Sequence, residues 1–138
     1  MILADTSAWV EYDRASGSPV DLRISELIER GGPLSVTQPV VIEVLAGART
    51  DEREADLRRL LRRFELLHFD AVTDFDAAVT IYRRCRRVGV TPRGTVDCLI
   101  AAVAWRHRAV LLASDVDLHR VARVVGIDLD DAGLRAPS

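Results

Sequence analysis

The chain has 138 residues, of which 49% are hydrophobic and 29% charged, and its formal net charge is −2. This length suits one domain with a sizeable core, and the composition excludes the disordered and membrane-spanning classes. All 19 basic residues are arginine, which excludes phosphate-binding loops and phosphatases that depend on a lysine. The sequence shows no signal peptide and no apolar run long enough to span a membrane, so we expect a cytoplasmic protein.

The opening residues predict a buried strand that ends in a carboxylate. Ile2-Leu3-Ala4 is an unbroken apolar run, typical of a strand buried on both faces of a parallel sheet, and Asp5 follows it. One interpretation is that Asp5 or Thr6 only caps the helix that begins near Ser7. The other is a functional carboxylate, because ligands collect at the carboxyl ends of parallel strands.

Helical and strand-like segments then alternate along the chain. Periodicity and capping signals predict helices at residues 7–12, 20–30, 40–48, 51–64, 74–88, 96–107 and 118–125. Apolar runs predict strands at residues 34–36, 66–69 and 110–113, and an edge strand at 127–129 before a frayed acidic tail. In the second helix we expect Leu22, Leu27 and Ile28 to face inward. This order predicts one α/β domain over residues 1–138, a three-layer α/β/α sandwich with a mostly parallel central sheet.

One charge interrupts an otherwise apolar helix. Residues 40–48 are apolar on nearly every side, so we expect this helix to be buried, and Glu43 is its only charge. A buried carboxylate needs a partner, because an unpaired charge is costly away from water. That partner is either an arginine or a metal ion.

The segment at residues 98–105 predicts the central buried helix, with Leu99 as a core residue. Thr95 is its expected N-cap. Asp97 lies in its first turn, where the helix dipole favours an anion, and dipole compensation alone would explain this residue. Cys98 and Cys85 fit small core positions better than a disulfide or a metal pair.

The acidic residues can also be explained by one shared site. Asp5 and Asp115 each follow a buried strand, so both lie on the carboxyl edge of a parallel sheet, while Asp97 opens one buried helix and Glu43 lies within another. Clustered carboxylates repel each other unless a cation neutralises them. Only three scattered histidines are present, so the ligands are hard oxygens, which favour Mg²⁺ or Mn²⁺. Such a site suits metal-activated water attacking a phosphodiester.

Four segments together, in this order, resemble the PIN-domain ribonucleases of the VapC toxin type across essentially the whole chain. They are residues 2–10, Glu43 followed by Leu45-Ala46-Gly47, residues 95–102 and residues 114–118. The resemblance implies a catalytic quartet that holds Mg²⁺ or Mn²⁺, with one further ligand; these residues are Asp5, Glu43, Asp97 and Asp115, and then Asp117. Leu118 stands where the family often has an aromatic residue, which leaves open whether Asp115 or Asp117 is the primary ligand.

The same resemblance implies a divalent-metal-dependent endoribonuclease that acts as the toxin of a toxin–antitoxin pair. It implies an RNA substrate, a cognate VapB-type antitoxin and a homodimer. Thr6 or Ser7 would orient Asp5 or the metal-bound water, and Arg93 and Thr95 would contact substrate or support the ligands. The alternative is a non-catalytic PIN-like module that binds RNA or a protein. A small-molecule phosphatase would share the metal site.

Overall fold

A parallel sheet forms the centre of the computed structural model, which describes residues 1–135. Its strand order is β3-β2-β1-β4, and every neighbouring pair is parallel. The strands are β1 (Ile2–Ala4), β2 (Leu34–Val36), β3 (Glu65–Leu66) and β4 (Val110–Leu112). The expected strands at residues 2–4, 34–36 and 110–113 are therefore confirmed. Because β1 pairs with β4 in register from Ile2↔Val110 to Ala4↔Leu112, the two chains leave the sheet side by side.

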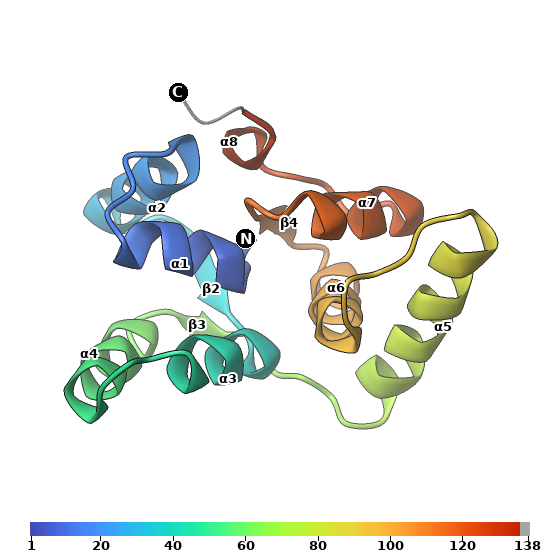
Figure 1. The fold of residues 1–138 in the computed structure, drawn as a ribbon, viewed down its shortest axis with the longest axis horizontal. Helices are drawn as coiled ribbons and strands as arrows, with labels where there is room; N and C mark the ends of the chain where they lie inside the picture. The colour runs from blue at the N-terminus through green and yellow to red at the C-terminus, as the bar shows by residue number, and fades with distance from the viewer. Residues whose placement is uncertain (136–138) are drawn as a thin grey trace.

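Helices cover both faces of this sheet. They are α1 (Thr6–Asp13), α2 (Pro19–Arg30), α3 (Gln38–Ala46), α4 (Asp51–Leu61), α5 (Thr73–Arg87), α6 (Thr95–His107), α7 (Val116–Val125) and α8 (Asp131–Leu134). Figure 1 shows α1 to α4 on one side of the strands and α5 to α7 on the other, which confirms the predicted three-layer α/β/α sandwich. No helix within residues 1–135 is long and apolar enough to cross a bilayer.

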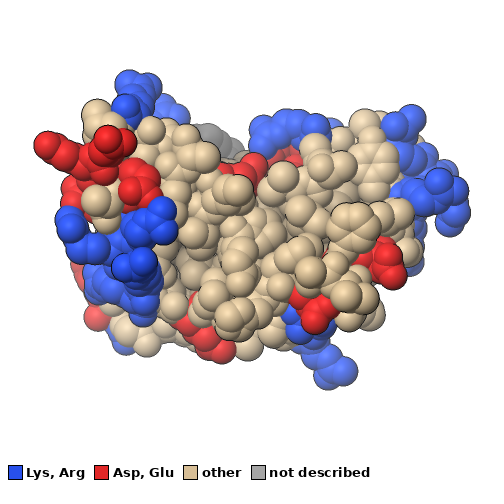
Figure 2. All heavy atoms as spheres, turned by 90° about the horizontal axis from the view of Figure 1, so that it is seen from below, with Lys and Arg blue, Asp and Glu red and all other residues tan. Residues whose placement is uncertain are grey.

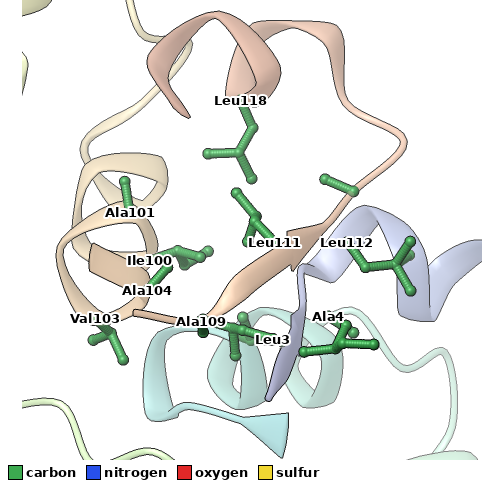
Figure 3. Packing of buried hydrophobic residues seen from close by; sticks show 14 of the residues in the cluster. Leu3, Ala4, Ile100, Ala101, Val103, Ala104, Ala109, Leu111, Leu112 and Leu118 are labelled. Carbon is green, nitrogen blue, oxygen red and sulfur yellow. The ribbon is translucent and has the colours of Figure 1, made fainter. Parts of the chain in front are cut away.

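The core is densest where β1 and β4 meet α6 and α7. Leu3, Leu111 and Leu118 are completely buried, and Figure 3 shows Leu118 pointing from α7 toward Leu111 in the sheet. Ile100 of α6 packs into the same cluster and is also fully buried. Burial of this apolar surface fixes α6 and α7 against β1 and β4, and thereby fixes where each helix begins.

Caps at expected positions start and stop several helices. The Ser18 side chain accepts a hydrogen bond from the Asp21 amide at 3.2 Å, and Pro19 occupies the first turn of α2, where its missing N–H costs nothing. Gly31 ends α2 in the left-handed conformation, with φ of 62°. Thr50 caps α4 by accepting a hydrogen bond from the Arg53 amide at 3.0 Å.

The edges of the fold differ from the sequence expectation. The strand expected at 66–69 is only Glu65–Leu66, and the one expected at 127–129 is a single parallel bridge between Leu111 and Leu129. The expected frayed tail is wrong for residues 131–134, which form α8, and its last residues, 136–138, lie outside the described part. Asp130 caps α8 and pairs with Arg23 Nε at 3.2 Å, which ties this helix to α2.

Three burial expectations are also wrong. Helix α3 is not buried all round, because only Pro39, Val40 and Val44 are buried and Ile42 is 66% exposed. Leu22 is 61% exposed, since the buried stripe of α2 runs through Val20, Ile24 and Leu27 instead. Leu99 is only partly buried at the edge of the core.

A buried ion pair, not foreseen from the sequence, joins α5 to α6. Asp74 is completely buried and accepts hydrogen bonds from Arg106 Nε and Nη2, each at 2.9 Å. Arg106 Nη2 also donates to the His68 carbonyl at 2.6 Å, and the Asp70 amide donates to Asp74 at 2.8 Å. These hydrogen bonds satisfy a charge that would otherwise be costly to bury.

Truncating Leu118 should destabilise the fold far more than the same change at Leu22. Leu118→Ala is expected to lower the free energy of unfolding by about 2–5 kcal/mol, because it leaves a cavity between α7 and the sheet. Leu22→Ala, at an exposed position, should change it by less than about 0.5 kcal/mol. Urea denaturation of both variants measures this difference, and equal losses would contradict the core described here.

Candidate active site

Two carboxylates lie at the carboxyl ends of neighbouring strands. Asp5 follows β1, and Asp115 comes three residues after the end of β4. Each caps the helix that follows: Asp5 Oδ2 accepts from the Ser7 amide at 3.1 Å, and Asp115 Oδ1 accepts from the Asp117 amide at 2.9 Å. In both residues the cap occupies one oxygen, and the other oxygen is buried and makes no hydrogen bond within residues 1–135.

Ser7 links the ends of these two strands. Its hydroxyl donates to Asp5 Oδ2 at 2.8 Å and accepts from the Ser114 amide at 2.9 Å. Because Ser114 directly precedes Asp115, the Ser7 side chain fixes the spacing between the loops that carry the two carboxylates. Ser7 therefore contacts Asp5, as the resemblance implied, and it also binds the backbone beside Asp115.

Asp97 reaches the same cleft as Asp5 and Asp115 from α6, on the other side of the sheet from α1 (Figure 1). It lies in the first turn of α6 and is almost completely buried. The residue before this helix is Gly94, which offers no side chain for a cap, so the prediction that Thr95 caps the helix is wrong. Thr95 is the first helical residue and is exposed.

Glu43 projects from α3, and its partner is a hydroxyl group. Thr6 Oγ1 donates to Glu43 Oε1 at 2.6 Å. Of the two partners that the sequence allowed, an arginine is not found: within residues 1–135 Glu43 makes no ion pair. Thr6 thus orients Glu43, whereas the resemblance implied that Thr6 or Ser7 orients Asp5 or the metal-bound water.

The four carboxylates line one cleft of about 490 Å³. Its lining residues are Asp5, Thr6, Ser7, Val10, Glu11, Arg14, Glu43, Arg93, Asp97, Ser114, Asp115 and Val116. The sequence analysis missed Val10, Glu11 and Arg14. Their spacing from Ser7 on one face of α1 is the helical signal that could have found them.

Asp117 and Thr95 do not line this cleft, unlike the other expected site residues. The Asp117 side chain is partly exposed and lies 3.5 Å from Arg120 Nη1, one turn along α7. The Asp115 side chain is only 8% exposed. The geometry therefore favours Asp115 over Asp117 as the acidic residue of this cleft.

Arg93 contacts the acidic cluster directly. It lies in the loop between α5 and α6, and its Nη2 is 2.9 Å from Asp115 Oδ2. Its side chain is 68% exposed, so the guanidinium reaches the buried carboxylate from the rim of the cleft. This is the one ion pair to a cleft aspartate or glutamate among residues 1–135.

Crowding changes the protonation of Asp97. Burial, and after it the negative charges of Asp5 and Asp115, raise the pKa of Asp97 to about 7, while Arg93 opposes this shift. Burial also raises the pKa of Asp5, and its hydrogen bonds from Ser7 work in the opposite direction. These carboxylates therefore interact, which is the situation that a bound cation relieves.

Three buried oxygens have the chemistry of a hard-cation site. Asp5 Oδ1, Asp97 Oδ2 and Asp115 Oδ2 make no hydrogen bond within residues 1–135. All three residues line the cleft, and such oxygens are the ligands that Mg²⁺ and Mn²⁺ prefer. No group of three His, Cys, Asp or Glu side chains in this part of the chain is already arranged to hold a metal. The donor set fits a divalent cation, provided that the carboxylates move closer together around it.

Known proteins are similar to this chain in sequence and in fold. The PIN domain matches residues 2–124 of the chain. Ribonuclease VapC11 of Mycobacterium tuberculosis and VapC ribonuclease Mb1587 of Mycobacterium bovis are each 42% identical to it over 128 residues, which cover 92% of this chain and 96% of the relative.

Solved structures with the same fold include two protein complexes. VapBC2 from Rickettsia felis, bound to a promoter DNA fragment, matches with a TM-score of 0.74 at 19% identity, over 94% of this chain and 98% of that chain. FitAcB from Neisseria gonorrhoeae matches with a TM-score of 0.72 at 20% identity, over 96% of this chain and 98% of that chain. These two likenesses show the fold.

The pKa of Asp97 predicts that the metal-free protein loses stability as the pH rises. In the unfolded chain this carboxyl ionises near pH 3.8, and in the folded chain near pH 7. Between these values only the folded state holds the proton, so the free energy of unfolding should fall by up to about 1.4 kcal/mol per pH unit. Urea denaturation in EDTA from pH 5 to pH 8 measures this fall.

Asp97→Asn is the matched control for this pH dependence, because an amide cannot ionise. Its free energy of unfolding should vary less between pH 5 and pH 8 than that of the wild type. An identical pH dependence in the two proteins would contradict the raised pKa.

Proposed function

We propose that this chain, which belongs to the PIN-domain family and to the VapC ribonucleases within it, is a divalent-metal-dependent endoribonuclease acting as the toxin of a toxin–antitoxin pair. The observation that carries the proposal is the meeting of four carboxylates in one cleft, where three of them have a buried oxygen without a hydrogen bond. A surface that only binds RNA gains nothing from buried like charges, because they repel phosphate as well as each other.

In this proposal the catalytic residues are Asp5, Glu43, Asp97 and Asp115. Asp5, Asp97 and Asp115 would hold Mg²⁺ or Mn²⁺ through their free oxygens, and Glu43 would hold a second ion or position the attacking water. When bound, a divalent cation supplies an activated water and neutralises the charge that develops on the scissile phosphate. Asp117 lies outside the cleft lining, which does not support it as a ligand.

The protein's own residues then set the geometry of cleavage. Ser7 keeps Asp5 beside the loop of Asp115, and Thr6 fixes Glu43 by its 2.6 Å hydrogen bond. Arg93, which lines the cleft and is largely exposed, would contact an RNA phosphate. Thr95 is exposed and does not line the cleft, so it has no assigned role.

The proposed partners follow from the relatives. The complex from Rickettsia felis is a VapBC assembly, and for this chain we propose a cognate VapB-type antitoxin, a homodimer, and action on RNA in the cytoplasm. An antitoxin that blocks cleavage must cover or enter the acidic cleft, since the proposed catalytic carboxylates all line it.

Cleavage should require both the cation and the cleft carboxylates. Purified protein with Mg²⁺ or Mn²⁺ should cut total cellular RNA into discrete fragments, and EDTA should abolish this activity. Asp5→Asn and Asp97→Asn should each lower the cleavage rate by at least about 100-fold, since each removes a charge that acts in the transition state. Asp76→Asn, an exposed position on α5, is the matched control and should keep full activity.

Two outcomes would contradict this proposal. If the wild type binds RNA but cuts none, the chain is a binding module and not a nuclease. If a generic phosphate ester is hydrolysed and competes with structured RNA, the site is that of a small-molecule phosphatase. A melting temperature of the Asp97→Asn variant at or above that of the wild type, measured at pH 8, would exclude loss of folding as the cause of lost cleavage.

A further inference from the structure

The ion pair between Arg93 and Asp115 uses an oxygen that the metal site needs. Nη2 of Arg93 lies 2.9 Å from Asp115 Oδ2, and this oxygen is one of the three buried carboxylate oxygens without a hydrogen bond. The ion pair reaches that oxygen without hydrogen-bond geometry. A guanidinium and a divalent cation cannot both occupy the open side of the same oxygen, because they repel each other at contact distance.

Resting on the function proposed above, we propose that Arg93 is a displaceable internal counter-ion of the acidic cleft. In the metal-free protein its guanidinium neutralises Asp115, and a divalent cation must displace it before all three carboxylates can become ligands. Metal binding is thus an exchange of one cation for another, and it frees Arg93 at the mouth of the cleft.

The surroundings of Arg93 allow its guanidinium to move away from Asp115. Its side chain is 68% exposed, so water can hydrate the guanidinium as soon as the ion pair opens. It is held by a loop between two helices, and Gly89 begins that loop with φ of 79° while Gly94 ends it. Arg106 is the contrast: two hydrogen bonds to the buried Asp74 and a third to a carbonyl fix its position.

A second arginine provides a matched control. Arg14 lines the same cleft from α1 and is exposed, and it makes no ion pair within residues 1–135. Arg14→Gln and Arg93→Gln therefore remove the same charge from the same rim. Only Arg93→Gln removes the contact with Asp115, so the difference between the two variants isolates that contact from the general field of the cleft.

The test is calorimetric titration of the RNA-free protein with Mn²⁺, for the wild type, Arg93→Gln, Arg93→Lys and Arg14→Gln. Arg93→Gln should bind Mn²⁺ more tightly than Arg14→Gln, by up to about fivefold, the contribution of a partly exposed ion pair. Arg93→Lys keeps a cation beside Asp115 and should return the affinity to near that of the wild type. In EDTA, Arg93→Gln should melt at a lower temperature than the wild type, and Mn²⁺ should raise its melting temperature more.

Three results would overturn the inference, and they have different meanings. Equal Mn²⁺ affinities for Arg93→Gln and Arg14→Gln would make the ion pair a bystander. Weaker binding by Arg93→Gln than by the wild type would mean that Arg93 holds Asp115 in place for the metal. If the wild type binds no Mn²⁺, or binds it no better than Asp97→Asn does, then the metal centre of the proposed function fails, and the counter-ion fails with it.

Discussion

The pairing of β1 with β4 is the constraint on which the cleft depends. It brings residues more than 100 positions apart into register, so that Asp5 and Asp115 leave the sheet from adjacent strands. The Ser7 hydroxyl then joins the two loops by bonding to Asp5 and to the Ser114 amide. Neither helix layer could place both carboxylates alone, since α1 and α7 lie on opposite faces of the sheet, as Figure 1 shows. The cleft is a property of the strand order, as it is at the carboxyl edge of other parallel sheets.

Asp5 and Asp115 divide their two oxygens between the fold and the cleft. One oxygen of each caps a helix, and the other makes no hydrogen bond within residues 1–135, so the cap at Asp5 is confirmed and still leaves an oxygen for the proposed metal site. This division decides what a substitution tests. Asparagine can still cap a helix through its carbonyl oxygen but carries no charge, whereas alanine removes the cap and the charge together. Loss of activity in an alanine variant would therefore confuse helix stability with catalysis, and an asparagine variant separates them.

The sequence was most informative where a short apolar run met a polar residue. The unbroken runs before Asp5 and Asp115 predicted β1 and β4 correctly, and with them the carboxyl edge of the sheet on which these carboxylates lie. Sequence patterns could not say which side of α3 is buried, because a helix that is apolar in every direction has no polar face to orient it. The exposure of Ile42 could therefore not be predicted. The ion pair of Arg93 with Asp115, and that of Arg106 with Asp74, were also out of reach. Each joins residues from elements whose relative placement is decided by packing, and single-residue patterns do not encode it.

The charge distribution of the whole molecule determines how the negative charge of the cleft can be balanced. Figure 2 shows blue arginine side chains at both ends of the face it presents, with largely uncharged surface between them. With a net charge of only −2, the protein as a whole does not attract anions. The negative charge of the cleft carboxylates therefore has to be balanced within the cleft itself. Three devices can do this: a proton on Asp97, the guanidinium of Arg93, or a divalent cation. The first two are built into the chain and stabilise it without metal. In the proposed metal-dependent enzyme both must give way to the cation, because a protonated Asp97 or an Asp115 paired with arginine is a poor metal ligand. The groups that balance charge in the metal-free protein would then set the free-energy cost of binding the metal.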